Sequence, residues 1–356
     1  MREPPRSRSI SVWCVSTLLG LASLAVASAI PQSPSLVLAD AASRFDASPV
    51  DTARSSPIPR LGRVFVIVGE NTSLADVTRR RAPYIAGPLK RRSAWLAGYR
   101  ARGDSLSLGN YVEMTSGQSI ACERADSPPA DPLTDEPICH QRVDNIFHQL
   151  QVAQISWRSW HESMPRRCFT DDVGTSRRRD SYIVHHNPAV YYDNVEGARY
   201  GAGPRPRPKR MCLRHVVPMG TTGKNDTSAF DAALRRGDMA RFNFVVPNNC
   251  ENGHDQCGGT DRVSQFDAFV RREVKLITAS PAYGPRSVIV VTYDEESSTV
   301  PHSTEVASLW LSPLVRPGVY RGDWTHASLL GTLERAFRLP LLAHARRAHL
   351  IHRIWR

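Results

Sequence analysis

Four short hydrophobic runs, rich in β-branched residues, predict strands that are buried on both faces of a sheet. Three of them lie far apart along the chain, at Val64–Val68, Phe242–Val246 and Ser287–Thr292, and the fourth is Val306–Leu311. A strand with one wet face would instead alternate apolar and polar residues. The runs therefore indicate a sheet whose two faces are both covered.

Three other segments carry apolar residues at helical spacing. They are Val143–Trp157, Asp261–Ala279 and His326–Leu339; in the second, Phe266 and Ile277 belong to one apolar stripe. Buried strands that alternate with amphipathic helices are typical of an α/β sandwich. We see no internal repeat.

The N-terminal segment has the pattern of a secretory signal. Arginines precede the apolar stretch Val12–Val26, which ends in Ala27-Ser28-Ala29, a motif of small residues like those at signal-peptide cleavage sites. We expect a signal peptide at 1–29, a flexible Ser/Pro/Ala-rich leader at 30–60 and one domain at 61–356. A membrane anchor is the alternative, but the stretch is short for a span of about 20 residues.

Composition limits the classes of protein. The 356 residues include 41% hydrophobic residues and a single long apolar run, which excludes a fully disordered chain and a multi-span membrane protein. Lys and Arg number 46 against 34 Asp and Glu, a net charge of +12 that falls to +10 without residues 1–29. This balance favours an anionic partner or substrate.

Six cysteines remain after the predicted cleavage, and an even number in an exported protein favours disulfides. We expect pairs between neighbours in the sequence: Cys122–Cys139, Cys168–Cys212 and Cys250–Cys257. A structural zinc site is the alternative, but the close Cys pairs that such a site needs are absent from the sequence.

A proline-rich basic segment, Arg199–Arg210, can be neither a helix nor a central strand. We interpret it as a surface loop. It either serves solubility alone or, with Arg177–Arg179, holds an anionic polymer.

Polar side chains follow three of the predicted strands. Glu70 and Asn71 come after the first run, Asp294 and Glu295 after the third, and the segment with His254 and Asp255 after Phe242–Val246. In open α/β sheets, ligands bind beyond the carboxyl ends of the strands. Clustered carboxylates repel one another unless a cation neutralises them, and oxygen donors suit hard divalent ions. Helix or turn capping is the alternative role for each acid.

A nucleophile is offered by the segment Ser105–Gly117, which we interpret as a turn-rich loop with several hydroxyl groups. A serine that binds a divalent cation is partly deprotonated near neutral pH and can attack phosphorus. Ser and Gly are also ordinary turn residues, so composition alone is a weak signal here.

Nine motifs in order, from about residue 63 to 340, resemble the phosphoesterase family, which includes bacterial acid phosphatases and phospholipases C and is a branch of the alkaline-phosphatase-like superfamily. The motifs are Val64–Asn71, Ser107–Gly117, Asp144–Leu150, Trp157–Pro165, His185–Pro188, Val245–Asp255, Val291–Glu295, Ser312–Gly318 and His326–Glu334. The resemblance implies a three-layer α/β/α sandwich and metal-assisted phosphoester hydrolysis.

The resemblance also implies roles for single residues, carried over where the motifs match. It implies a divalent metal held by Glu70, Asn71, Ser107, Asp294 and Glu295. It implies Ser107 as the nucleophile, with Thr115 as a second candidate. The further residues expected at the reaction centre are Asn110, His186, His254, Asp255 and His326.

We therefore expect a secreted acid phosphatase that binds one divalent ion and acts on phosphomonoesters, with a histidine that protonates the leaving group. A phospholipase C-type phosphodiesterase that takes phospholipids is the alternative enzyme. A non-catalytic basic protein that binds anionic polymers is the alternative of another class. We expect no sequence-specific nucleic acid partner and no stable transmembrane anchor.

Overall fold

The computed structural model describes residues 58–356, apart from 121, 123, 132–137, 175–180, 198–208, 224 and 298–303. The predicted signal peptide and most of the predicted leader lie outside the described residues, as do Arg177–Arg179 and most of the basic loop. Ile58 is only 1% exposed and packs in the hydrophobic core. Ile58 thus packs with the domain although it comes before the expected boundary at 61.

One eight-stranded sheet forms the centre of the fold, in the order β4-β3-β5-β1-β6-β7-β2-β8. Only β7 runs antiparallel to its neighbours. The strands are β1 Val64–Gly69, β2 Ala94–Arg100, β3 Trp157–His161, β4 Val216–Pro218, β5 Phe242–Val246, β6 Val288–Tyr293, β7 Ser308–Leu311 and β8 Gly318–Thr325. The sequence predicted β1, β5, β6 and β7 to within two residues at each end.

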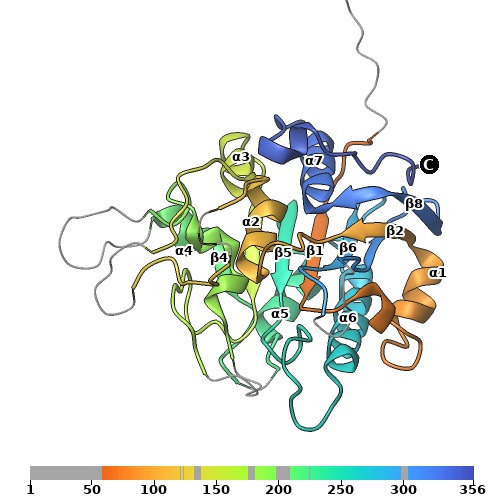
Figure 1. The fold of residues 1–356 in the computed structure, drawn as a ribbon, viewed down its shortest axis with the longest axis horizontal. Helices are drawn as coiled ribbons and strands as arrows, with labels where there is room; N and C mark the ends of the chain where they lie inside the picture. The colour runs from red at the N-terminus through yellow and green to blue at the C-terminus, as the bar shows by residue number, and fades with distance from the viewer. Residues whose placement is uncertain are drawn as a thin grey trace, which may run out of the picture. The chain divides into compact units, whose positions relative to one another are not determined.

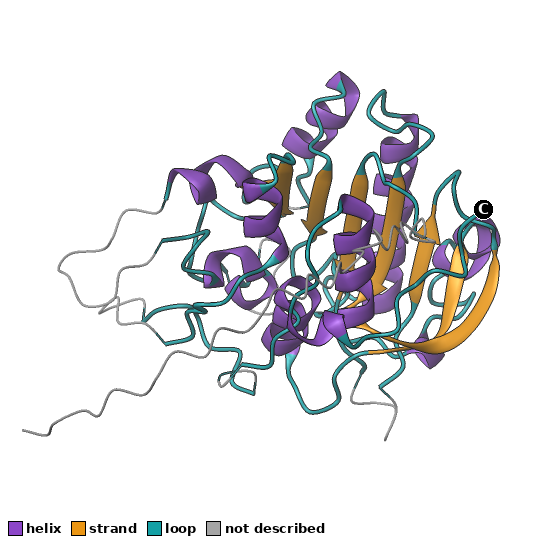
Figure 2. Cartoon of the chain, turned by 90° about the horizontal axis from the view of Figure 1, so that it is seen from above, coloured by secondary structure: helices purple, strands orange, loops and turns teal. Residues whose placement is uncertain are grey.

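Helices cover both faces of this sheet. In Figure 1, α3 and α7 lie above the central strands, whereas α5 and α6 lie below them, and Figure 2 shows the strands side by side between helices. The helices are α1 Lys90–Arg92, α2 Ser107–Ser116, α3 Ile146–Val152, α4 Arg210–His215, α5 Ser228–Arg236, α6 Arg262–Ala279 and α7 His326–Phe337. This arrangement confirms the predicted α/β sandwich.

Short helical turns lie in the connections. They are η1 Leu74–Asp76, η2 Ile85–Leu89, η3 Val184–His186, η4 Pro188–Tyr191 and η5 Ala343–Arg346.

The helix predicted over 143–157 is wrong at both ends. Asn145 caps α3 by accepting a hydrogen bond from the His148 amide, and the helix ends at Val152. Gln154 then has a φ of 55°, a left-handed conformation that no helix continues through. Trp157, which fits the helical pattern, instead opens β3.

The segment Ser105–Gly117 was predicted to be a loop, but its greater part is the helix α2. All ten residues of α2 are buried, and the helix contacts α7 and α3. Its N-terminus has no cap within the helix; instead Asp126 accepts a hydrogen bond from the Leu108 amide at 2.9 Å. A cap supplied from a distant loop is invisible to local sequence patterns.

Six cysteines form three disulfides in the sequential order, Cys122–Cys139, Cys168–Cys212 and Cys250–Cys257. Such bonds persist in oxidising compartments and are rare in the cytosol. In the part of the chain that the structure describes, no helix is long and apolar enough to cross a membrane.

Candidate active site

The carboxyl ends of β1 and β6 bring the predicted acidic residues together. These strands are parallel neighbours, and Gly69 pairs with Tyr293 at their ends. The next residues, Glu70 and Asp294, therefore leave the sheet side by side. The Asp294 amide still donates to the Gly69 carbonyl at 3.0 Å, so the ladder holds this junction in place.

Ser107 is the first residue of α2 and faces these carboxylates. Its Oγ lies 3.4 Å from Glu70 Oε2 and 3.4 Å from Glu295 Oε1. The unpaired amides and the dipole of a helix N-terminus favour negative charge, so this position suits a hydroxyl that ionises or binds a phosphoryl group. The structure thus brings the predicted nucleophile and the predicted metal ligands into one cluster.

Amide and phenol groups complete this cluster. The backbone amide of Asn71 donates to Asp294 Oδ1 at 3.0 Å, and the side-chain amide of Asn71 donates to Glu295. Asn110 lies one helical turn after Ser107, with Nδ2 3.5 Å from Glu295 Oε2. Tyr111 donates its phenol proton to Glu70. Asn71 adopts a φ of 39°, an uncommon conformation that turns the chain sharply at the strand end.

Two of the predicted histidines lie on the side of Glu70. His186 is buried in η3, and its Nε2 lies 3.4 Å from Glu70 Oε2 without forming a hydrogen bond. The His186 and His254 rings are 5.9 Å apart between centroids. His254 is half-exposed, and its Nδ1 lies 2.7 Å from Asp255 Oδ1. The loop after β5 therefore delivers its histidine and acid to the same edge as the loop after β1.

His326 was expected to face the pocket, but both of its ring nitrogens are occupied inside the protein. Nε2 lies 2.5 Å from the Asp294 carbonyl oxygen, and Nδ1 lies 3.0 Å from the Tyr99 hydroxyl. A carbonyl only accepts, so Nε2 carries the proton, and burial lowers the pKa of His326 to about 4. Neutral His326 holds the strand end that carries Asp294 and has no free nitrogen for substrate.

Thr115, the second predicted nucleophile, lies eight residues after Ser107, about 12 Å farther along α2. Its hydroxyl donates to the Tyr111 carbonyl at 2.7 Å and contacts the Tyr192 hydroxyl at 2.6 Å. It is 1% exposed. These contacts give Thr115 a structural role within the helix.

The three carboxyl groups share a buried environment that disfavours their charge. Burial raises the pKa of Glu70 well above its ordinary value, and the neighbouring Asp294 raises it further. Burial also raises the pKa of Asp294. For Glu295, burial and then the charge of Asp294 raise the pKa to about 9. Such a cluster needs either protons or a cation.

The donors present fit a hard divalent cation. Asp294 Oδ2 and Asn71 Oδ1 are buried oxygens that accept no hydrogen bond. Buried acceptors without partners are costly, and a cation would satisfy them together with the carboxylates. Among the described residues, no group of three or more His, Cys, Asp or Glu side chains has the arrangement of a formed metal site. The three carboxylates here would therefore need donors from Asn71 and Ser107 beside them to hold an ion.

Several residues at the site were not predicted. Tyr111 stood in a motif, but its bond to the buried Glu70 had no signal in the sequence. Arg262, at the start of α6, donates from Nη1 to the Asn71 carbonyl at 2.7 Å and to the Gly253 carbonyl at 3.1 Å, so it joins the loops after β1 and β5. Asp126 caps α2, as described above. Contacts of this kind depend on tertiary structure.

Two curated proteins resemble the chain in sequence. Phosphatidylinositol-3-phosphatase of Mycobacterium tuberculosis is 24% identical over 302 residues, which cover 85% of each protein. An acid phosphatase of Aspergillus fumigatus is 22% identical over 207 residues, 56% of this chain and 40% of the fungal protein.

Solved structures share the fold at low identity. A protein of the alkaline phosphatase superfamily from Vibrio parahaemolyticus superimposes with a TM-score of 0.53 at 9% identity, covering 81% of this chain and 70% of that one. A protein from Bacteroides thetaiotaomicron, studied for glycosaminoglycan metabolism, gives 0.52 at 9% identity over 82% and 81% of the two chains. The model of the phosphoesterase family matches residues 94–340. Because this match covers more than half of the chain and both sequence relatives are phosphatases, the chain belongs to the phosphoesterase family and is a phosphoester hydrolase.

Proposed function

We propose that the protein is a secreted, metal-dependent phosphatase that cleaves phosphomonoesters through Ser107. The observation that carries this proposal is the position of Ser107 Oγ, 3.4 Å from carboxylate oxygens of both Glu70 and Glu295 at the N-terminus of α2. A hydroxyl there can lose its proton to the acidic cluster. The three disulfides support export.

Glu70, Asn71, Asp294 and Glu295, with the Ser107 hydroxyl, would hold the divalent ion. When bound, such an ion lowers the pKa of a hydroxyl and offsets charge on phosphate oxygens. The unpartnered oxygens of Asp294 and Asn71 support this assignment.

In the first step, Ser107 Oγ forms a bond to phosphorus while the bond from phosphorus to the leaving oxygen breaks, which gives a phosphoserine and an alkoxide. His254 protonates the alkoxide; it is half-exposed, so it can recover a proton from water, and Asp255 orients its ring. Water then attacks the phosphoserine, the bond from phosphorus to Ser107 Oγ breaks, and the serine regains a proton.

His186 has a different role in this scheme. Burial lowers its pKa well below the ordinary value, and the neighbouring His185 and His254 add to this effect. It is therefore neutral near pH 7 and offers an N–H group rather than a positive charge. With Asn110, it would hold phosphate oxygens as negative charge develops.

The mycobacterial relative, named for a phosphoinositide monoester, supports including phosphatidylinositol 3-phosphate among the substrates. The phosphodiesterase alternative shares the same chemistry and differs in substrate. A panel of p-nitrophenyl phosphate, bis-p-nitrophenyl phosphate and phosphatidylinositol 3-phosphate, run with and without chelator, separates these functions. Salt-dependent anion binding that survives chelation, with no phosphate release, would favour the non-catalytic alternative.

Ser107→Ala tests the mechanism. We expect its phosphatase activity to fall by a factor on the order of 10³ or more, with the ion still bound through the four other residues that would hold it. Ser105→Ala, two residues earlier, is the matched control and should keep activity within about twofold. Full activity in Ser107→Ala, with activity lost in Thr115→Val, would move the nucleophile to Thr115.

A further inference from the structure

A cavity of about 1000 Å³ is lined by residues that do not belong to the acidic cluster. It is formed by the end of β8, the C-terminal end of α7 and the last residues of the chain. Arginines, two histidines and several apolar side chains line it, among them His349 and His352. The volume is that of a site for a small ligand.

The walls of this cavity are strongly basic. Arg321, Arg335, Arg338 and Arg353 line it, and none of the four forms a salt bridge or donates a side-chain hydrogen bond to another described residue. The one acid, Asp323, already pairs with Arg100. All four are exposed, and the charge of Arg335 also acts on the neighbouring Glu334. Four arginines around one hollow raise the local positive potential, which an anion would offset.

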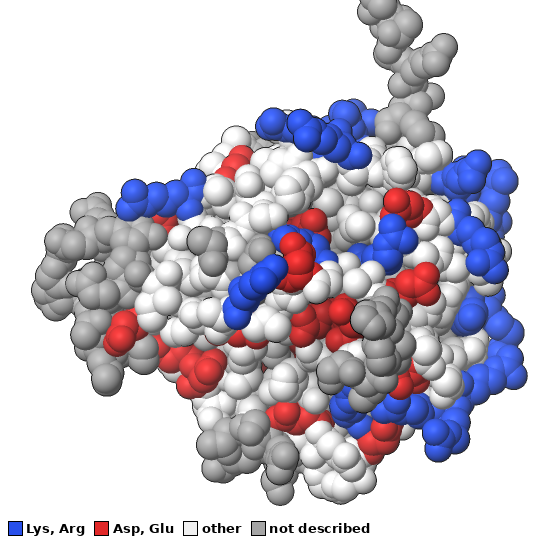
Figure 3. Space-filling view, in the orientation of Figure 1, with Lys and Arg blue, Asp and Glu red and all other residues white. Residues whose placement is uncertain are grey.

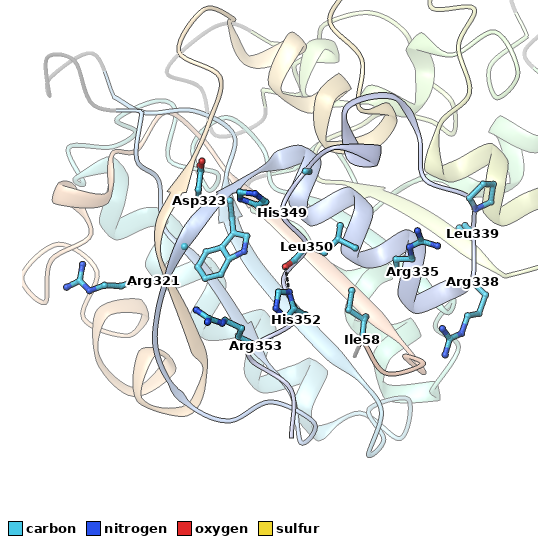
Figure 4. Close-up of a pocket in the computed structure, with 14 residues that line it drawn as sticks. Ile58, Arg321, Asp323, Arg335, Arg338, Leu339, His349, Leu350, His352 and Arg353 are labelled. Atoms are coloured by element: carbon cyan, nitrogen blue, oxygen red, sulfur yellow. Dashed lines mark hydrogen bonds between the residues drawn. The ribbon is translucent and has the colours of Figure 1, made fainter. Parts of the chain in front are cut away.

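The arginines stand on two sides of the cavity. In Figure 4, Arg321 and Arg353 lie on one side, Arg335 and Arg338 on the other, and Ile58, Leu350 and His352 between them. The apolar lining also includes Trp324 at 4% and Leu339 at 6% exposed. A ligand with two anionic groups, separated by a body that tolerates apolar contact, would match this arrangement.

The cavity is separate from the proposed catalytic centre. None of the residues in the acidic cluster lines it. Arg335 and Arg338 lie at the far end of α7, about 18 Å along the helix from His326, which is beside Asp294, whereas Trp324 on the other wall comes just before this helix. Ile58 precedes β1 at the amino end of the strand, whereas Glu70 follows its carboxyl end. Figure 3 shows basic side chains over the regions where α7 and β8 lie in Figure 1 and acidic ones nearer the middle.

Favourable interaction with the helix dipole accounts for only part of the cluster. Basic residues at a helix C-terminus are stabilising on their own, which explains Arg335 and Arg338. Arg321 stands in β8, and Arg353 lies beyond the last helical turn, so neither has this reason. The helix dipole therefore does not account for the whole cluster.

We propose that this cavity binds a polyanion with two or more phosphate or sulfate groups, either free or as the head group of a lipid. Guanidinium groups bind such oxyanions with charge-assisted, bidentate hydrogen bonds. The inference goes beyond the proposed phosphatase activity and does not depend on it.

Titration calorimetry with inositol hexakissulfate tests the site, since the probe has no phosphoester bond to be cleaved. We expect Arg321→Gln/Arg353→Gln and Arg335→Gln/Arg338→Gln each to weaken binding at least tenfold. The control is Arg235→Gln/Arg236→Gln, which removes the same charge from the last turn of α5, where both arginines are exposed. We expect it to change binding less than twofold.

A second arm uses phosphatidylcholine vesicles with and without phosphatidylinositol bisphosphate. Co-sedimentation of the wild type, lost in both double variants, would identify a lipid head group as a source; calorimetric binding without sedimentation would support a free ligand. Three results would overturn the proposal. The wild type and both double variants bind equally, the control variant loses as much affinity as the double variants, or the wild type binds neither probe. Thermal unfolding of each variant separates loss of the fold from loss of the site.

Discussion

Removing the divalent ion should make the protein less stable as the pH rises. In the metal-free folded protein, burial and the charge of Asp294 raise the pKa of Glu295 to about 9. In the unfolded chain the same carboxyl group titrates at its ordinary value of 4.5. Between these two values the folded state holds the extra proton, so the free energy of unfolding falls with increasing pH.

The size of this effect follows from the two pKa values. Between the two pKa values, each pH unit lowers the free energy of unfolding by about 1.4 kcal/mol for one carboxyl group that stays protonated in the folded state. pH 7 lies 2.5 units above the ordinary pKa of 4.5. The free energy of unfolding therefore falls by at most about 3 kcal/mol between these two pH values. Glu295 is half-buried, so partial screening reduces the effect to about 1–3 kcal/mol. Glu70 and Asp294, also with raised pKa values, act in the same direction.

The measurement is thermal unfolding between pH 5 and 9, in chelator and in excess divalent ion. We expect the Tm of the chelated protein to fall with pH and the ion to restore it. Glu295→Gln should weaken the fall and raise the stability of the chelated protein at pH 8, although it lowers activity. The control Asp238→Asn changes an exposed carboxyl group far from the site. A chelated Tm that rises over this range, or a Glu295→Gln variant as pH-sensitive as the wild type, would refute the reasoning.

Two further changes probe the support of the site. Tyr111→Phe removes the hydrogen-bond donor to Glu70, so a buried acceptor loses its partner. We expect the free energy of unfolding to fall by about 1–3 kcal/mol and kcat to fall more than KM changes. Unchanged kcat and Tm would contradict this. Cys250→Ser/Cys257→Ser removes the disulfide that closes the loop with His254. We expect the free energy of unfolding to fall by about 2–3 kcal/mol and phosphatase activity to fall with it. Activity and Tm equal to those of the wild type would show that the disulfide does not position the loop.

The sequence was informative where one local pattern decides the structure. The continuous apolar runs predicted β1, β5 and β6 because a strand buried on both faces tolerates only such residues. Glu70 and Asp294 could be placed together because parallel strands end at one edge of a sheet. The six cysteines pair between neighbours in sequence, as expected.

Tertiary contacts account for the errors. Ser107–Ser116 is a helix although its polar residues are typical of a turn, because burial against α7 and the distant cap from Asp126 stabilise it. His326 was expected at the reaction centre from the family resemblance, yet its partners Tyr99 and Asp294 occupy both ring nitrogens. Neither partner is close to it in sequence, so no local pattern indicates these bonds.

The most direct test of the central claim is to trap the phosphorylated enzyme. The wild type, mixed with p-nitrophenyl phosphate and quenched in acid, is digested and analysed by mass spectrometry. The account predicts phosphate on the peptide that contains Ser107, at that residue, and its absence after chelation. Phosphate at Thr115 or on a histidine, or turnover by Ser107→Ala at the wild-type rate, would contradict it.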